Sequence, residues 1–199
     1  APARQLEEIA EKTQRLVARK ERVFLNELVP ALESSGIHLT RYTEVDDEDR
    51  RFLDDMFERE MYPVLTPLAV DPAHPFPYIS NLSLNLAVLV TNPKPGEQQF
   101  ARVKVPVERG RWVAIPGTGR IVALEDVVAR NIQDVFPGTR ILHCHPFRVI
   151  RSADLNRDDE EAEDLLQMIS EELRERRFAS VVQLEIGQGM PRQVVELLT

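Results

Sequence analysis

Cysteine is almost absent from this sequence, since Cys144 is the only one in 199 residues. A single thiol cannot form an intramolecular disulfide, which excludes the disulfide-stabilised class of secreted proteins and favours a reducing, cytosolic setting. Long apolar runs are also lacking, and none approaches the roughly 18 residues needed to cross a bilayer. These two absences leave an ordinary globular protein, long enough to bury one sizeable core.

Positive charge is in deficit as well. The chain has 25 Lys and Arg against 33 Asp and Glu, a net charge of −8. A surface of this charge repels a polyanion at long range unless basic residues cluster locally. We therefore expect no nucleic acid among its partners.

The first 36 residues have the pattern of one long helix. Apolar side chains recur at three- and four-residue steps over 3–35, separated by Glu, Lys and Arg, which predicts an amphipathic helix roughly 50 Å long. Gly36 suits the left-handed position after a helix, and Pro30 is expected to kink the last turn. One helix cannot bury its own apolar stripe, so it must pack on another helix, in this chain or a neighbouring one.

A proline-rich segment, 62–77, leads into the alternating stretch 82–91. Its prolines hold the backbone extended and exclude helix. Apolar residues at every second position then predict a strand. The extended ribbon presents Phe76 and Tyr78, which need outside surface to pack on, so both are candidate interface residues.

The remaining pattern predicts an α+β fold, with helices packed on a mainly antiparallel sheet. Strands at 82–91, 101–107 and 112–115 are joined by short turns and predict a three-stranded meander. Pro106 places the middle strand at a sheet edge or beside a bulge. The other expected elements are strands at 37–41, 140–151 and 181–186, and helices at 46–62, 124–136, 156–177 and after Pro191.

Two stretches, HPFPYISNLSLNL at 74–86 and FRVIRSADL at 147–155, stand in this order before a strand reading VVQLEI at 181–186. Their wording and order resemble the head, or middle, domain of bacterial polyphosphate kinase. The resemblance implies that 1–36 is a long leading helix, the end of an N-terminal helical domain, and that 37–199 is the head domain, truncated at its C-terminal end. A start at Ala1 without methionine and a stop inside an apolar helical pattern are what cut points would give.

The resemblance also implies a function, that of an ATP:polyphosphate phosphotransferase, which reversibly moves the ATP γ-phosphate onto polyphosphate. In that family the phosphoryl group is carried on a histidine of the C-terminal domains, and ATP and magnesium are held by motifs that do not occur here. We therefore expect no catalytic, cofactor-binding or metal-binding residue in this chain, and no activity from it alone. The family's head implies dimerisation and tunnel walls, in a cytoplasmic enzyme that is peripheral to the inner membrane.

Basic residues gather on the predicted meander and give a second group of candidates. Guanidinium forks and ammonium groups bind phosphate well, so a polyanion contact is one interpretation. The alternative is a solvated sheet face with ion pairs to Glu108 and Glu125. The candidate residues are Arg102, Lys104, Arg109 and Arg111, with Arg120, Arg148 and Arg151 nearby.

His143-Cys144-His145 invites a metal interpretation, but on a strand the two imidazoles share one face and the thiol points to the other. A closed zinc site needs about four ligands, and only His38 and His74 remain. A structural role with a buried, inert thiol is favoured. Two other functions stay open: an independent α+β interaction module that pairs through its long helix, and a small metal-dependent enzyme using His74, His143 and His145.

Overall fold

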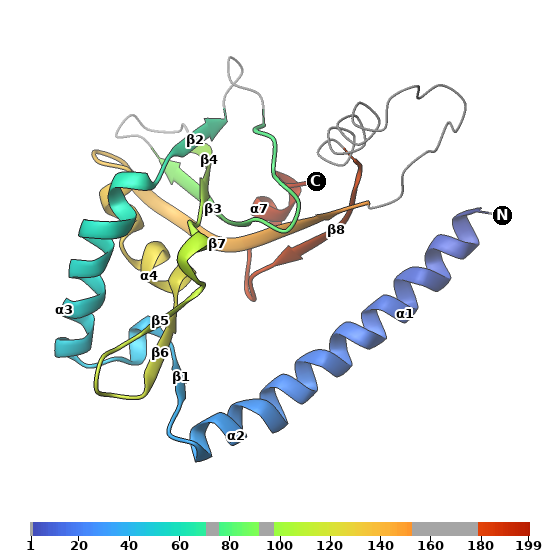
Figure 1. Ribbon diagram of the computed structural model, residues 1–199. Helices are drawn as coiled ribbons and strands as arrows, with labels where there is room; N and C mark the ends of the chain where they lie inside the picture. The colour runs from blue at the N-terminus through green and yellow to red at the C-terminus, as the bar shows by residue number, and fades with distance from the viewer. Residues whose placement is uncertain (1, 71–75, 92–97, 153–178) are drawn as a thin grey trace, which may run out of the picture.

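The computed structural model describes residues 2–70, 76–91, 98–152 and 179–199 (Figure 1). Two β-sheets and their helices form the body of the molecule, and a long helix projects from it. The expected α+β class, with a long N-terminal helix and a mainly antiparallel sheet, is confirmed. The helix expected at 156–177 and the turn at 92–96 lie outside the described residues.

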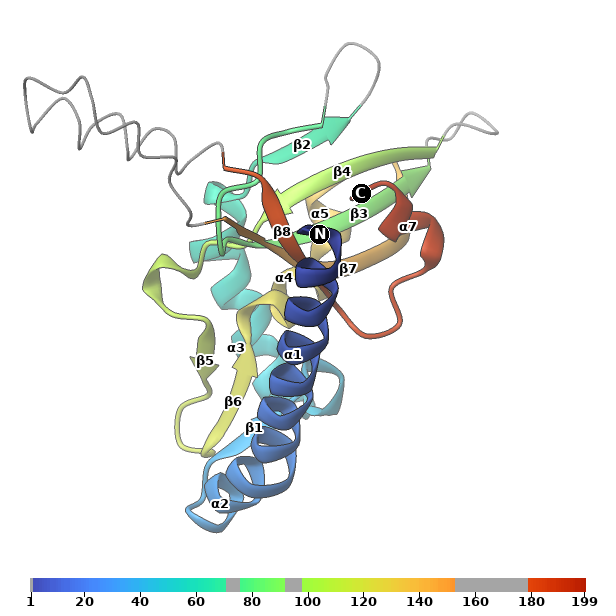
Figure 2. The same ribbon diagram turned by 90° about the vertical axis from the view of Figure 1, so that its right-hand side faces the viewer.

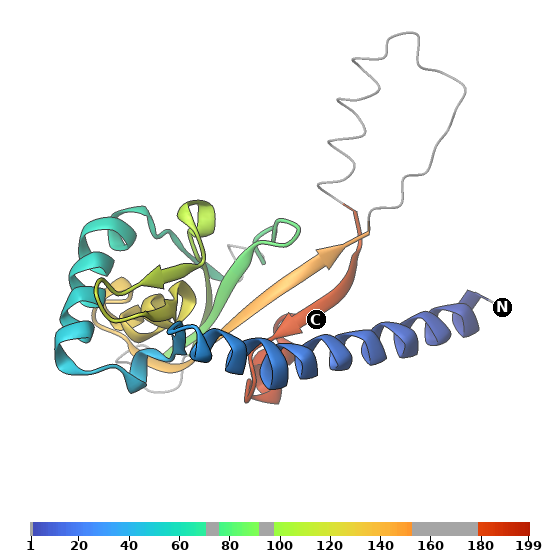
Figure 3. The same cartoon turned by 60° about the horizontal axis from the view of Figure 1, so that its bottom comes forward.

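The projecting helix, here called the arm, comprises α1 (Pro2–Val23), the π-helical turn η1 (Phe24–Leu28) and α2 (Val29–Ser34). The helix departs from α-helical geometry in this π-helical turn, just before Pro30, and not in its last turn as predicted. At the end of the turn the Val29 N–H donates to the Phe24 carbonyl. Gly36 ends the helix at φ +78°, as expected. Figures 1 and 3 show α1 leading away from the sheets, joined to them only at its C-terminal root.

The arm's root enters a small three-stranded sheet of order β1-β6-β5, made of β1 (His38–Thr40), β6 (Arg120–Ala123) and β5 (Trp112–Ala114). β1 runs parallel to β6, and the His38 N–H donates to the Gly119 carbonyl at 2.9 Å. A Cβ on Gly119 would collide with the Gly36 carbonyl oxygen, so this approach requires glycine. The meander prediction is wrong in its third member, because β5 belongs to this sheet.

The large sheet has the order β2-β4-β3-β7-β8 and is antiparallel throughout. Its strands are β2 (Pro67–Val70), β4 (Gln98–Lys104), β3 (Leu84–Thr91), β7 (Arg140–Arg151) and β8 (Val181–Ile186). β7 and β8 have their predicted bounds. The edge placement drawn from Pro106 is wrong: β4 ends at Lys104 and lies between β2 and β3, so that proline interrupts no ladder.

The proline-rich segment is less uniform than predicted. Pro63 lies in the short 3-10 helix η4 (Tyr62–Val64), so helix is not excluded there. Pro67 begins β2, which the sequence did not reveal, and it does so on an edge strand, where a missing N–H is tolerated. Residues 71–75 lie outside the described part, and 76–80 continue without regular structure.

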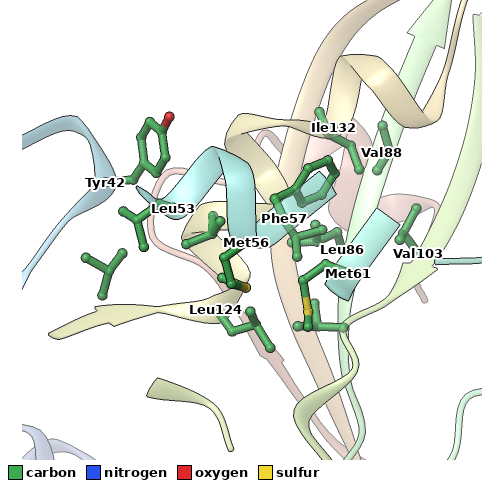
Figure 4. Close-up of a cluster of buried hydrophobic side chains, with 14 of the residues drawn as sticks. Tyr42, Leu53, Met56, Phe57, Met61, Leu86, Val88, Val103, Leu124 and Ile132 are labelled. Carbon is green, nitrogen blue, oxygen red and sulfur yellow. The ribbon is translucent and has the colours of Figure 1, made fainter. Parts of the chain in front are cut away.

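Helices cover the first face of the large sheet and bury the main core (Figure 4). α3 (Asp47–Met56) begins at Asp46, whose carboxylate accepts from the Glu48 and Asp49 N–H groups as predicted. The π-turn η3 (Phe57–Met61) extends it. The helix expected at 124–136 is divided into α4 (Leu124–Arg130) and α5 (Ile132–Val135). The core residues labelled in Figure 4 are Tyr42, Leu53, Met56, Phe57, Met61, Leu86, Val88, Val103, Leu124 and Ile132.

The second face of the large sheet is covered by α7 (Arg192–Glu196), which lies beside β3 and β4 in Figure 2. Val194 of this helix is fully buried with Phe147 and Phe100. The central strand β3 is therefore buried on both faces, which a simple apolar-polar alternation does not predict.

Candidate functional site

The predicted basic residues do not form one cluster. Arg111 donates from Nε to Glu125 Oε1 at 2.8 Å and stacks over Trp112, with 5.6 Å between guanidinium and ring centroid. Lys104 Nζ lies 2.8 Å from Glu108 Oε1. The ion pairs to Glu108 and Glu125, offered as the alternative interpretation, are thus present. The side chain of Arg109 lies outside the described part.

Two neighbouring arginines, Arg148 and Arg120, also have partners that sequence reasoning did not identify. Arg148 Nε donates to Glu185 at 2.7 Å, and Arg120 Nη1 pairs with Asp46 at 2.7 Å and with the buried Asp49. These pairs join β7 to β8 and β6 to the start of α3, elements far apart in sequence, so no local spacing could have signalled them. They fix the body of the fold.

Arg102 differs from the others because it is buried, with 7% of its surface exposed. The prediction of a solvated basic face on β4 is therefore wrong at this residue. Its Nε donates to the Asn85 side-chain oxygen at 2.8 Å, and Asn85 in turn donates to the Ser83 carbonyl at 2.8 Å. Leu68 on β2 lies directly opposite Arg102, so burial follows from an edge strand that the sequence did not reveal.

A pocket of about 320 Å³ opens beside Arg102, between β2 and the end of β4. It combines apolar walls with a few polar groups. Its lining residues are Val64, Thr66, Leu68, Arg102, Lys104, Pro106 and Glu108. Val64, Thr66 and Leu68 come from the segment that the sequence predicted only as an extended ribbon.

The candidate interface residues Phe76 and Tyr78 are each 41% exposed. Phe76 stacks on Phe100 of β4, with 5.6 Å between ring centroids, and the Arg151 guanidinium lies 4.6 Å from the Tyr78 ring centroid. Arg151 also donates to the Ile79 carbonyl at 2.9 Å. The ribbon is thus held on its own sheet, while a part of each ring faces outward.

His143 and His145 share one face of β7, with ring centroids 6.0 Å apart, while Cys144 packs against the main core on the other face. Burial raises the pKa of the Cys144 thiol to about 12, and burial followed by the charge of His143 lowers the pKa of His145. Within the described ranges, no group of three or more His, Cys, Asp or Glu side chains could hold a metal ion. His74 lies outside them.

The arm carries a row of exposed apolar side chains. None of its described side chains is buried, and a shallow groove of about 440 Å³ runs along it, lined by Leu16, Arg19, Lys20, Val23, Phe24 and Leu28. The exposed apolar residues of the arm are Leu6, Ile9, Leu16, Phe24, Leu25 and Leu28. We call them the arm stripe. The sequence left its partner open between this chain and a neighbouring one, and among the described residues all six side chains stay between 39% and 67% exposed.

Comparison with known proteins finds a matching family. Residues 48–199 match the family model "Polyphosphate kinase middle domain". The polyphosphate kinase of Streptomyces coelicolor is 45% identical over 197 residues, covering 99% of this chain and 26% of that protein. The polyphosphate kinase of Thermosynechococcus vestitus is 46% identical over 198 residues, covering 96% of this chain and 27% of that protein.

A solved structure supports the fold. The crystal structure of polyphosphate kinase from Porphyromonas gingivalis superimposes with a TM-score of 0.68 at 24% identity, over 86% of this chain and 29% of that one. The chain thus spans between a quarter and a third of the length of the relatives it matches. No helix in the described ranges is long and apolar enough to cross a membrane.

Proposed function

The chain belongs to the polyphosphate kinase family, and from that premise we propose that it is the scaffold and assembly portion of an ATP:polyphosphate phosphotransferase. In this proposal 37–199 is the head domain and 1–36 is the last helix of a preceding helical domain. The main support for an assembly role is the arm, because a 22-residue helix with apolar side chains in solvent is stable only when another surface covers it.

The scaffold role rests on how the described polar side chains are used. Arg111, Arg120 and Arg148 all bond carboxylates of their own chain, which ties strands and helices together and leaves them little freedom for chemistry. The Cys144 thiol, with its raised pKa, is a poor nucleophile at neutral pH. Transfer of the ATP γ-phosphate to polyphosphate, with magnesium, is accordingly assigned to other parts of the intact cytoplasmic enzyme, which is peripheral to the inner membrane.

The assembly role has two surfaces. The arm stripe is assigned to the rest of the polyphosphate kinase chain, because six exposed apolar side chains at helical spacing suit helix-against-helix packing. The outward parts of Phe76 and Tyr78 are assigned to a homodimer contact and to the walls around the catalytic tunnel.

A chimera tests this proposal. The 199-residue sequence replaces the matching segment of the Streptomyces coelicolor enzyme, and polymer formation from ATP is measured. We expect activity within about tenfold of the parent, and we expect the isolated chain to make neither polymer nor acid-labile phosphohistidine. Phosphohistidine on the isolated chain, or a folded but inactive chimera, contradicts the scaffold role.

The dimer contact is tested separately in the same chimera. Phe76→Asp with Tyr78→Asp is expected to shift the mass measured by light scattering from dimer to monomer, whereas Trp112→Asp, a similarly exposed aromatic, leaves the dimer intact. An unchanged dimer in the double variant removes the ribbon from the interface. The rival function, a free interaction module that pairs with a foreign helix, also fits the arm stripe, and it predicts an inactive chimera.

A further inference from the structure

Among the described residues, Arg102 is a buried cation with no anionic partner. Across the described residues no carboxylate forms an ion pair with it, and the one hydrogen bond of its side chain is to the neutral Asn85 side chain. Burial alone lowers the pKa of Arg102, with no opposing carboxylate to raise it, yet a guanidinium stays charged at neutral pH. Buried charges are normally paired, so this arrangement lacks half of an ion pair.

A pocket lies beside the unpaired guanidinium and offers space for an anion. Nε is engaged by Asn85, which fixes the plane of the group, and the side chain lines the 320 Å³ pocket. Lys104, which carries an ammonium group, and Thr66, which carries a hydroxyl, line the same pocket. Register explains this convergence: Lys104 is two residues from Arg102 on β4, so both side chains leave the same face of the sheet.

We propose that this pocket binds a phosphoryl oxyanion, held by Arg102 and Lys104 with Thr66 beside them. A phosphoryl group has three acceptor oxygens, which match donors on three separate side chains better than the two oxygens of a carboxylate do. Glu108 supports this choice, because that carboxylate already reaches the pocket and bonds Lys104, yet leaves Arg102 unpaired. The apolar walls of Val64, Leu68 and Pro106 strengthen the attraction by keeping water away.

Glu108 gives the pocket a specific signature. An oxyanion that reaches Lys104 competes with the Glu108 carboxylate, whose pKa is lowered by the same ammonium group. Removing the charge of Glu108 therefore strengthens binding, whereas removing the charge of Arg102 or Lys104 weakens it. If Arg102 had only a structural role, these three substitutions would not change anion binding in opposite directions.

Two sources could supply the oxyanion, free phosphate or a phosphate chain. Only the phosphate chain rests on the proposed function; the pocket itself depends on the surroundings of Arg102. Binding of orthophosphate, linear polyphosphate and acetate to the 199-residue chain is measured by titration calorimetry at constant ionic strength, with chloride as the reference salt. Polyphosphate binding without orthophosphate binding identifies a chain-specific site, and equal binding of acetate overturns the phosphoryl assignment.

Binding measurements on variants test whether the oxyanion binds in this pocket. We expect Arg102→Met to weaken binding at least about tenfold and Lys104→Met about threefold, and Glu108→Gln to strengthen it severalfold. Arg192→Met, which removes an exposed arginine paired with Glu196, is the matched control and should bind as the parent does. No phosphate-specific binding by the parent, or equal binding by a folded Arg102→Met, overturns the inference. If Arg102→Met does not fold, unchanged binding in both Lys104→Met and Glu108→Gln overturns it instead.

Discussion

The arm and the large sheet distribute their side chains in opposite ways. The arm leaves leucine and phenylalanine in solvent, while the sheet encloses an arginine and an asparagine. Both depart from the usual rule of apolar inside and charged outside. The difference teaches that apolar exposure marks where the chain needs a partner macromolecule, whereas polar burial marks where it has room for a small charged group.

Phenylalanine gives the sharpest test of this contrast, because the arm and the main core under the sheet each have one at the start of a π-helical turn. Phe57 is 1% exposed in the main core, so Phe57→Ala should lower the free energy of unfolding by about 4 kcal/mol. Phe24→Ala on the arm is the matched control and should cost below about 1 kcal/mol in urea unfolding. Similar losses from both variants would mean that the arm is packed in solution.

Charge burial in the body should have the next largest effect. Glu125 is 5% exposed, and its Oε2 has no hydrogen-bond partner among the described residues, so Arg111 supplies most of its compensation. Arg111→Met leaves that carboxylate buried and unpaired, and should cost about 2 kcal/mol in urea unfolding. Arg192→Met removes an exposed pair and is expected to stay within about 0.5 kcal/mol. A stable Arg111→Met would assign the Glu125 site to packing alone.

Alkaline pH should weaken the body through Tyr42. Burial, and then the hydrogen bond that its hydroxyl donates to Asp54 at 2.6 Å, raise the pKa of Tyr42 to about 12. The folded chain thus keeps a proton that the unfolded chain loses near pH 10. This contribution is complete below pH 10 and is lost as the pH rises toward 12, by roughly 1 kcal/mol per pH unit at most.

Urea unfolding at pH 9, 10 and 11 measures this slope, and Tyr42→Phe serves as its control. The control lacks the titrating hydroxyl, so its stability should fall less steeply with pH than that of the parent, although it starts lower. Parallel slopes in the two proteins would show that Tyr42 does not titrate differently on folding.

The smallest effect on the isolated chain should come from the arm stripe. Leu16 is 67% exposed, so Leu16→Gln should change the free energy of unfolding by less than about 0.5 kcal/mol. In the Streptomyces coelicolor chimera the same substitution should reduce the melting temperature, because burying a leucine contributes about 2 kcal/mol. Arg15→Gln removes an exposed pair with Glu11 and should change neither the unfolding free energy of the isolated chain nor the melting temperature of the chimera. An unchanged melting temperature for Leu16→Gln in the chimera would argue against a packed arm.

Sequence reasoning was strongest where a pattern is local. The arm, the Asp46 cap and the strands β7 and β8 all follow from periodicity and capping chemistry within a few residues. It failed where the determining contact is distant. β2 was hidden by its prolines, β5 joined another sheet, and β4 was placed at an edge because Pro106 was read as part of it.

The candidate site shows the same division. Ion pairs to Glu108 and Glu125 were offered as the alternative interpretation, and the structure forms them with Lys104 and Arg111. The burial of Arg102 was not foreseen, because it depends on Leu68 across an unpredicted strand and on Asn85 from the neighbouring one. A basic residue at an alternating position is indistinguishable from a solvated one until its flanking strands are known.

The pairing of β1 with β6 bears on how the protein is made. The arm's root is secured by hydrogen bonds to Gly119 and the residues after it, which a ribosome adds long after the arm itself has emerged. Until Arg120 has left the exit tunnel, the arm stripe belongs to a nascent chain without a finished base. In that interval a chaperone that recognises apolar helices would find its target here.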